Sequence, residues 1–408
     1  MNCRSCNTKV NHQILDLGFS PPSNSFLTLE QLSQPEIYFP LRMMFCEHCF
    51  LVQIDEFAKH EDIFNHEYHY FSSYSNSWLK HAKDYTEMMI QRFNLNGQHQ
   101  VIEIASNDGY LLQYFKKKNI PVLGIEPTSN TAQISQNKGI ETLVEFFGFK
   151  LAKDLVDKNI KADVLLGNNV LAHVPDINDF VSGMKLLLKK DGVITMEFPH
   201  LLQLVKNIQF DTIYHEHYSY LSCIAVQELF HRHDLELFDV EELDTHGGSL
   251  RIFVKHISDQ TKKVSSFVTY ILEKEQTYGL NNLKFYNNFQ NKVDVVKNNF
   301  LDFLLKAAKE QKKVVAYGAA AKGNTFLNYC GVRKDLIQFI IDASPYKQNK
   351  FIPGAHIPVY SETLLKETKP DFILILPWNL KSEISTQLSY VGDWDCKFVV
   401  AVPELVIF

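Results

Sequence analysis

The sequence predicts an α/β protein in which two α/β units follow a small N-terminal module. From residue 100 onward, short apolar runs alternate with helical segments, and this alternation is typical of a parallel sheet covered by helices on both faces. A second passage of the same kind begins after a polar helical stretch at about 280–311. The first 60 residues differ from both passages, because they hold four of the seven cysteines and read as short and irregular.

The composition is that of a soluble globular protein with two or three domains. The chain has 408 residues, of which 45% are hydrophobic and 22% charged. Its net charge of −6 and its scattered lysines argue against a nucleic-acid partner. No apolar run is long enough to span a membrane, and the N-terminus lacks the apolar core of a signal peptide. We therefore expect a cytoplasmic protein without a membrane partner, in which cysteines are thiols or metal ligands.

The N-terminal module carries two CxxC motifs, Cys3-x-x-Cys6 and Cys46-x-x-Cys49. Each motif places two thiolates on one tight turn, and two such turns complete a tetrahedral four-sulfur zinc site. Four protein ligands leave no open position, so this Zn²⁺ is expected to be structural. The 39 residues between the motifs exceed the spacing of a compact zinc ribbon and are expected to have structure of their own. The alternative is two unrelated thiol pairs.

The first α/β unit follows a helical run from Ser75 to Phe93, and its predicted strands are 101–105, 121–125, 163–167 and 192–198. The segment 101–111 ends a strand in a tight turn and starts a helix, and Glu126 follows about 20 residues later, where a carboxylate can accept hydrogen bonds from ribose hydroxyls. An NAD site uses the same acid, but its GxGxxG is missing, since Gly109 is the turn's single glycine. S-adenosylmethionine has no phosphate to cradle, so the turn favours that cofactor. The alternative is an ordinary α/β turn with a chance glutamate.

A cluster of titratable side chains follows at 211–220. Tyr214, His215, Glu216 and His217 can together supply a general base, an orienting carboxylate and a phenolic donor. The alternation of histidines around Glu216 is not a convincing metal site. The alternative is a polar loop with satisfied hydrogen bonds. A His-Gly-Gly-Ser-x-Arg run at 246–251 follows, whose glycines permit close approach to a ligand and whose Arg251 can hold an anion, although an ordinary loop is equally consistent.

The second α/β unit has predicted strands at 313–317, 337–341, 371–376 and 397–401. Its first strand leads through a turn at Gly318 into a helix that carries Lys322. Backbone N–H groups at such a turn, together with a lysine, can hold phosphate groups.

These motifs together resemble the sugar-nucleotide C-methyltransferases of deoxysugar biosynthesis, over essentially the whole chain. The double CxxC module is similar to their zinc-binding domain, and Glu103-Ile-Ala-Ser-Asn-Asp-Gly109 to their first cofactor motif, with Ala105 where the family has glycine. The runs at 214–217 and 246–251 are the most specific matches. Segments 315–325 and 342–350 resemble the family's two sugar-nucleotide-binding loops.

The resemblance implies a class I S-adenosylmethionine methyltransferase domain between a zinc-binding module and a second Rossmann-like α/β domain. The implied domains are 1–65, 66–255 and 256–408. The implied reaction is methylation at C3 of a nucleotide-linked 4-keto-6-deoxy sugar through an enolate. His217 or Tyr214 is the expected base, and His217 is preferred because imidazole titrates near neutral pH. His215 or Tyr214 is expected to donate to the enolate oxygen. Residues expected to hold the cofactor are Glu103, Ala105, Ser106, Asn107, Gly109, Tyr110, Glu126, Pro127, Asn168, Asn169, Val170 and His173. Residues expected to hold the substrate are His246, Gly248, Ser249, Arg251, Tyr317, Gly318, Ala319, Lys322, Thr325, Asp342, Lys347 and Lys350.

Two other functions are consistent with parts of the sequence. An O- or N-methyltransferase for a small metabolite shares the cofactor site but needs no base beside a carbon acid. A zinc-ribbon protein that binds a partner or nucleic acid and has a degenerate enzyme core is disfavoured by the acidic net charge and the intact 214–217 run. The sequence leaves open the nucleotide carrier (dTDP, GDP or CDP), the sugar configuration, the stereochemical outcome, and whether the protein is a monomer or a homodimer.

Overall fold

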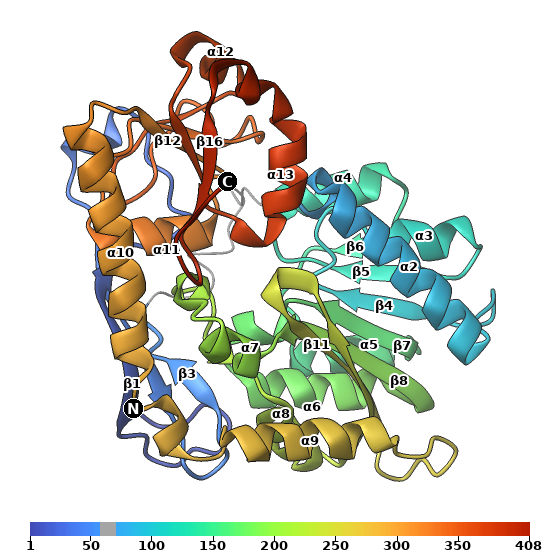
Figure 1. Cartoon of the computed structure of the whole chain (residues 1–408). Coiled ribbons are helices and arrows are strands. Elements are labelled where there is room, and N and C mark those ends of the chain that lie inside the picture. The colour runs from blue at the N-terminus through green and yellow to red at the C-terminus, as the bar shows by residue number, and fades with distance from the viewer. Residues whose placement is uncertain (58–70) are drawn as a thin grey trace.

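The computed structural model describes residues 1–57 and 71–408, in which the strands form three sheets (Figure 1). A central α/β unit lies beside an N-terminal antiparallel sheet, and a second α/β unit lies above both in Figure 1. The predicted fold class is confirmed. The predicted domain boundary at 65/66 lies outside the described residues, and the boundaries stay a prediction. Within the described ranges, no helix is long and apolar enough to cross a membrane.

The central sheet has the strand order β10-β11-β8-β7-β4-β5-β6 in the described chain. All four predicted strands are present, and β11 lies antiparallel to both of its neighbours, which corrects the expectation of a purely parallel sheet. The sequence does not reveal the β10–β11 hairpin, because residues 246–251 read as a ligand loop, whereas residues 249–251 begin the strand β11, which is buried up to its last residue. The strands are β4 (Val101–Ile104), β5 (Val122–Ile125), β6 (Thr142–Leu143), β7 (Ala162–Asn168), β8 (Leu188–Pro199), β10 (Leu235–Leu243) and β11 (Ser249–His256).

Helices cover both faces of this sheet because alternate strand residues point to opposite sides. Val101 packs into a cluster with Trp78, Tyr85 and Phe115, and its neighbour Ile102 packs into the cluster on the other face. The first face is covered by α2 (Asn76–Phe93) and α3 (Leu112–Lys117), while the second cluster contains residues of α5 (Phe149–Asp157), α6 (Ile177–Leu187), α8 (Cys223–His231) and α9 (Ser266–Tyr278). A further helix, α4 (Ser129–Asn137), lies between β5 and β6 in the chain.

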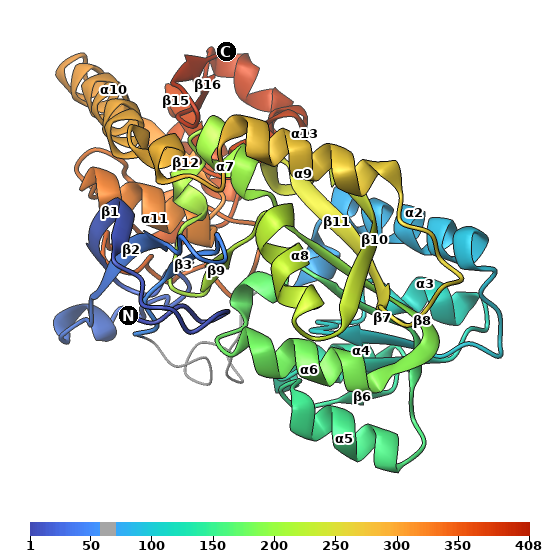
Figure 2. The ribbon, with the colours of Figure 1, turned by 90° about the horizontal axis from the view of Figure 1, so that it is seen from below.

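The N-terminal segment is a sheet rather than an irregular stretch, which corrects that expectation. Its strands β1 (His12–Ser20), β2 (Phe39–Phe45) and β3 (Val52–Ile54) pair antiparallel, and the structure predicted between the two CxxC motifs is confirmed. Two register shifts in β1 break the alternation that would have marked it as a strand. The fourth strand, β9 (Ser219–Tyr220), ends the predicted 211–220 cluster, begins two residues after His217 and pairs with β3 (Figure 2).

The C-terminal unit contains the four predicted strands within a sheet of order β14-β13-β12-β15-β16-β17. All described pairs in it are parallel except β16–β17. The helix expected at 280–311 is shorter, because the 3₁₀ turn Leu283–Tyr286 precedes α10. The strands are β12 (Val314–Tyr317), β13 (Ile340–Ile341), β14 (Val359–Tyr360), β15 (Phe372–Ile375), β16 (Lys397–Val400) and β17 (Val406–Ile407). The helices are α10 (Phe289–Lys309), α11 (Ala321–Cys330), α12 (Thr363–Thr368) and α13 (Lys381–Gln387).

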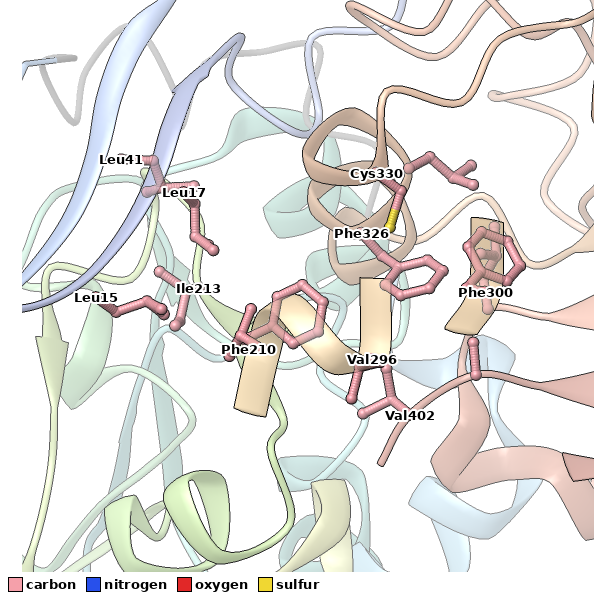
Figure 3. Packing of buried hydrophobic residues seen from close by; sticks show 14 of the residues in the cluster. Leu15, Leu17, Leu41, Phe210, Ile213, Val296, Phe300, Phe326, Cys330 and Val402 are labelled. Carbon is pink, nitrogen blue, oxygen red and sulfur yellow. The ribbon is translucent and has the colours of Figure 1, made fainter. Parts of the chain in front are cut away.

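One hydrophobic cluster joins the N-terminal sheet to the C-terminal unit (Figure 3). Leu15 of β1 contributes from one side, and Phe300 of α10 and Phe326 of α11 contribute from the other. Phe210 and Ile213 lie between these groups; both follow α7 (Leu201–Lys206) and both are fully buried. The cluster therefore fixes the start of the segment that carries residues 214–217.

Candidate active site

A cavity of about 660 Å³ lies where all three parts of the chain meet. One wall is formed by the carboxyl ends of β4, β5 and β7, as expected for a ligand site of a parallel sheet. Asn24 of the N-terminal module, residues of the 214–217 segment and Lys322 of α11 also line it. The predicted site residues on this cavity are Ala105, Asn107, Tyr110, Glu126, Pro127, Asn168, Asn169, Val170, His173, Tyr214, Glu216, His217, His246, Lys322 and Lys347.

The turn after β4 is shaped by residues with positive φ. Ala105 has φ 57°, Asn107 φ 49° and Gly109 φ 73°. A Cβ on Gly109 would come within 2.6 Å of the Ile140 side chain, so both packing and conformation require glycine there. The single glycine of this turn serves helix packing, and it does not cradle a phosphate.

Glu126 anchors this turn from the next strand. Its Oε2 accepts the Asn107 N–H at 2.8 Å and its Oε1 accepts the Thr128 N–H at 2.9 Å. The side chain is buried, and burial raises its pKa above the usual range. Glu126 therefore lies on the cavity wall with both of its oxygens oriented by backbone N–H groups.

Two side-chain amides at the end of β7 have buried polar atoms that a bound ligand could hydrogen bond. Asn168 Nδ2 and Asn169 Oδ1 are buried and have no hydrogen-bond partner among the described residues. Asn169 uses its Nδ2 to hydrogen bond His246 Nε2 at 2.8 Å. Burial lowers the pKa of nearby His173 to about 4, so its ring is neutral. Unsatisfied amides on a largely apolar cavity fit a cofactor that combines an apolar adenine with polar groups, as S-adenosylmethionine does.

Three predicted cofactor residues lie behind the cavity wall. Glu103, Ser106 and Gly109 do not line the cavity. Burial, with the charges of Asp108 and Glu126 nearby, raises the pKa of Glu103 well above its usual range. These residues support the turn.

Sequence reasoning missed Trp78, which lines the cavity and contacts the His246 ring edge-on at 5.0 Å. No motif marked it, because an aromatic residue in the first turn of a helix is usually core.

The catalytic segment presents a hydrogen-bonded tyrosine–histidine pair. His217 Nδ1 donates to the Thr212 carbonyl at 2.9 Å, which leaves Nε2 to accept from the Tyr214 hydroxyl at 2.8 Å. Burial lowers the pKa of His217 well below its usual range, so the ring is unprotonated at neutral pH. His217 is thus neutral with Nε2 as its accepting nitrogen, which is the form that a general base needs.

Glu216 and His215 point in different directions. Glu216 lines the cavity, and its Oε1 accepts from Asn24 Nδ2 at 2.6 Å. Burial raises the pKa of Glu216 to about 7. His215 instead lies against the N-terminal sheet, with Nε2 3.2 Å from the Pro40 carbonyl, and the structure does not bring it to the cavity.

Two lysines of the C-terminal unit reach the cavity. Lys322 Nζ donates to Asn379 Oδ1 at 2.7 Å, and burial lowers its pKa, an effect that the Asp211 carboxylate opposes. Lys347 Nζ donates to the Ala319 carbonyl at 2.9 Å and lies 3.6 Å from Asp342 Oδ2. Asp342 also accepts the Ala319 N–H at 2.8 Å, so two predicted substrate residues build the turn that positions Lys347.

The remaining predicted substrate residues do not line the cavity. Arg251 is paired with Glu197 at 3.0 Å and with Glu241 at 2.8 Å, so its charge is already balanced. Thr325 Oγ1 donates to the Ile213 carbonyl at 2.9 Å and thereby ties α11 to the catalytic segment. The others in this group are Gly248, Ser249, Tyr317, Gly318, Ala319, Asp342 and Lys350.

The four predicted cysteine ligands form one cluster. Their Sγ atoms all lie within 4.8 Å of one another, with Cys3–Cys49 at 3.4 Å and Cys6–Cys46 at 3.6 Å. A tetrahedral zinc site with Zn–S bonds of about 2.3 Å separates its sulfurs by roughly 3.8 Å. The donor set and spacing therefore fit Zn²⁺.

Three family models match successive parts of the chain. They are described as a zinc binding domain (residues 3–64), a methyltransferase domain (75–240) and a C-methyltransferase C-terminal domain (244–403). The C-methyltransferase NovU of Streptomyces niveus is 30% identical over 402 residues, which cover 98% of this chain and 95% of that protein. A ubiquinone biosynthesis O-methyltransferase of Bartonella quintana (strain Toulouse) is 23% identical over 96 residues, 23% of this chain and 39% of that protein.

Solved methyltransferase structures cover a part of the chain. The magnesium protoporphyrin IX methyltransferase of Synechocystis PCC 6803 with bound SAM has a TM-score of 0.34 and 12% identity, and covers 44% of this chain and 79% of that one. An S-adenosylmethionine-dependent methyltransferase of Clostridium acetobutylicum ATCC 824 has a TM-score of 0.36 and 11% identity, and covers 44% of this chain and 92% of that one.

Proposed function

Because this chain belongs to the C-methyltransferase family, we propose that it methylates C3 of a nucleotide-linked 4-keto-6-deoxy sugar by way of an enolate. The enzyme is an S-adenosylmethionine-dependent C-methyltransferase with a structural zinc, as predicted. The observation that supports the finer proposal is the Tyr214–His217 pair on the cavity. An oxygen or nitrogen acceptor already carries a lone pair, whereas a carbon acceptor needs a base that generates one.

Each group of the cavity has one proposed task. Glu126, Asn168 and Asn169 would hold S-adenosylmethionine, which when bound supplies an electrophilic methyl group on a sulfonium. Lys322 and Lys347 would supply positive charge toward the nucleotide diphosphate. Asn24 and Glu216 would orient the sugar between them.

The base step follows from the hydrogen-bond directions. A ketone at C4 makes the C3 proton acidic, and His217 Nε2 takes that proton because Nδ1 is already committed to the Thr212 carbonyl. Once protonated, Nε2 becomes a donor toward the Tyr214 oxygen, and the phenol proton turns to the enolate oxygen. One hydrogen-bond donor of this kind stabilises the transition state by roughly 3–4 kcal/mol. The enolate carbon would then form a bond to the methyl group that bound S-adenosylmethionine supplies, with S-adenosylhomocysteine as the leaving group and the C3 proton kept on His217.

The proposal is tested by mass spectrometry with labelled S-adenosylmethionine and a panel of dTDP-, GDP- and CDP-linked 4-keto-6-deoxy sugars. We expect one labelled methyl group on one panel member, on a carbon of the ring. A label found on oxygen or nitrogen, or on no panel member, would contradict the proposal.

The enolate step is tested separately by deuterium exchange. With S-adenosylhomocysteine in place of the methyl donor, the enzyme should exchange the C3 hydrogen of its sugar substrate for solvent deuterium. An O- or N-methyltransferase would leave that hydrogen in place.

A further inference from the structure

One side chain of the zinc module contacts a residue that lines the active-site cavity and the residue that follows His217. Arg4 lies between the ligands Cys3 and Cys6, and its side chain is only 7% exposed. Its Nη1 donates to the Pro175 carbonyl at 2.9 Å, and Pro175 lines the cavity on the cofactor side. Its Nη2 donates to the Ile54 carbonyl of β3 at 2.8 Å.

The same guanidinium reaches the catalytic segment. It lies over the Tyr218 ring, 5.1 Å from the centroid, and Tyr218 directly follows His217. The Tyr218 carbonyl accepts the Ile54 N–H at 3.1 Å, one residue before β9 joins β3. Arg4 thus contacts the segment 168–176 through Pro175 and reaches Tyr218, the residue next to the segment 214–217.

The methyltransferase unit holds this zinc knuckle in return. Asn178 Nδ2 donates to the Arg4 carbonyl at 2.8 Å and to the Ser5 carbonyl at 3.0 Å, and Arg232 Nη1 donates to the Ser5 carbonyl at 2.7 Å. Asn178 lies three residues after Pro175, in the first turn of α6. Arg4 therefore binds the backbone beside the cavity, and Asn178 in turn binds the backbone of the turn between Cys3 and Cys6.

We propose that Arg4 is a positioning residue that couples the zinc site to the cofactor pocket, so that zinc and S-adenosylmethionine strengthen each other's binding. Zinc fixes the turn between Cys3 and Cys6, the turn fixes the guanidinium, and the guanidinium fixes Pro175 and the segment before it. Coupling between two sites is reciprocal, so the cofactor must tighten zinc by the factor by which zinc tightens the cofactor. The inference uses neither the keto-sugar nor the base, so it stands or falls separately from the proposed reaction.

The first test is made on the unaltered full-length enzyme. Zinc affinity is measured by equilibrium competition with a chromophoric chelator, with and without saturating S-adenosylhomocysteine. We expect the ligand to tighten zinc about tenfold, within the range of 5–150-fold usual for coupled sites. Equal zinc affinity in both conditions would overturn the proposal.

The second test uses variants of Arg4. Calorimetry with S-adenosylhomocysteine should show about tenfold weaker binding to Arg4→Gln at full zinc stoichiometry, and Arg4→Lys should recover part of the loss because it keeps a buried cation and one donor. In Arg4→Gln, S-adenosylhomocysteine should no longer tighten zinc. The matched control is Arg42→Gln, since Arg42 lies in the same module but is 38% exposed and paired with Asp55 at 2.8 Å. Unchanged binding in a zinc-loaded Arg4→Gln enzyme, or equal weakening in the control, would overturn the proposal.

Discussion

At the scale of single residues, the direction in which each side chain of the 214–217 segment points determines which of them line the cavity. The His217 N–H donates to the Tyr214 carbonyl at 2.9 Å, and this turn places the rings of Tyr214 and His217 4.0 Å apart. His215, between them in sequence, points to the N-terminal sheet. Sequence reasoning selected all of these residues because their chemistry is alike, but it had no means to tell which side of the turn each one faces.

The proposed base gives the first prediction. His217→Asn should abolish methyl transfer, because the amide cannot accept a proton, while S-adenosylhomocysteine affinity stays within about twofold. Tyr214→Phe should retain slow turnover, since it removes one donor that is worth roughly 3–4 kcal/mol. Rates come from single-turnover assays and affinities from calorimetry. Wild-type activity in His217→Asn would remove this residue from the mechanism.

Glu216 gives a prediction about pH. Burial raises its pKa in the folded protein to about 7 from the ordinary 4.5, so between these pH values the folded state keeps a proton that the unfolded chain releases. Stability therefore falls as pH rises through this window. Glu216→Gln does not titrate and should be more stable than the wild type above pH 7, by up to roughly 3 kcal/mol, with the difference gone near pH 4.5.

Denaturant unfolding at pH 5 and at pH 8 checks this prediction, with the exposed Glu273→Gln as the control. A stability difference for Glu216→Gln that is the same at pH 5 and pH 8 would contradict the assignment of this carboxyl as the titrating group.

At the scale of elements, the eight strands predicted for the two α/β units are present, whereas the two-residue parallel strands β6 and β14 and the strands that pair only antiparallel were not predicted. The four predicted strands of each α/β unit are apolar runs bounded by turns. A strand that is buried on both faces needs apolar residues at successive positions, so its sequence shows such a run. The β10–β11 hairpin and the N-terminal sheet lack a clear pattern, because β11 buries the charged residues Arg251 and Lys255 among its apolar ones and β1 is interrupted by register shifts. Pairing of β9 with β3 joins residues more than 160 positions apart, and no local signal specifies it.

Helix α9 carries an anchor that only the structure reveals. Glu275 is fully buried; its Oε1 accepts the Cys223 N–H at 2.7 Å and its Oε2 accepts the Ile224 N–H at 2.9 Å, at the start of α8. His200 Nε2 lies 2.7 Å from the same carboxylate. One side chain therefore caps α8 and fixes the residue before α7.

Glu275→Ala should destabilise the protein by about 3–5 kcal/mol, because it leaves a buried helix start and a buried imidazole unpaired. Glu273→Ala, on the exposed side of the same helix, should change stability by less than about 0.5 kcal/mol. Chemical denaturation compares the two. A small effect at Glu275 would mean that water takes over these hydrogen bonds.

At the scale of the whole molecule, the N-terminal sheet and the C-terminal unit share one core. Phe210 lies at its centre, with its ring 5.8 Å from that of Phe326 and 5.4 Å from that of Tyr329. The two parts are distant in sequence, yet neither encloses this cluster alone. We therefore infer that they lose their structure together.

Phe210→Ala should cost about 3–5 kcal/mol, as large-to-small core substitutions do. Native-state hydrogen exchange should show loss of protection in both β1 and α11, while Phe267→Ala on the surface of α9 leaves both unchanged. Loss of protection in one of the two alone would show that the shared core does not couple them.

The pairing of β9 with β3 has a consequence for anyone who recombines these enzymes. A graft that exchanges the first 57 residues for those of a relative replaces three strands of a sheet whose fourth strand stays behind in the recipient. The donor's β3 must then pair with the recipient's β9, and this ladder of backbone hydrogen bonds begins one residue after Tyr218 and two after His217. Chimeras that carry the donor's residues 210–221 together with its N-terminal segment should keep their turnover, whereas chimeras that exchange residues 1–57 alone should pair β9 with an unmatched β3 and lose turnover.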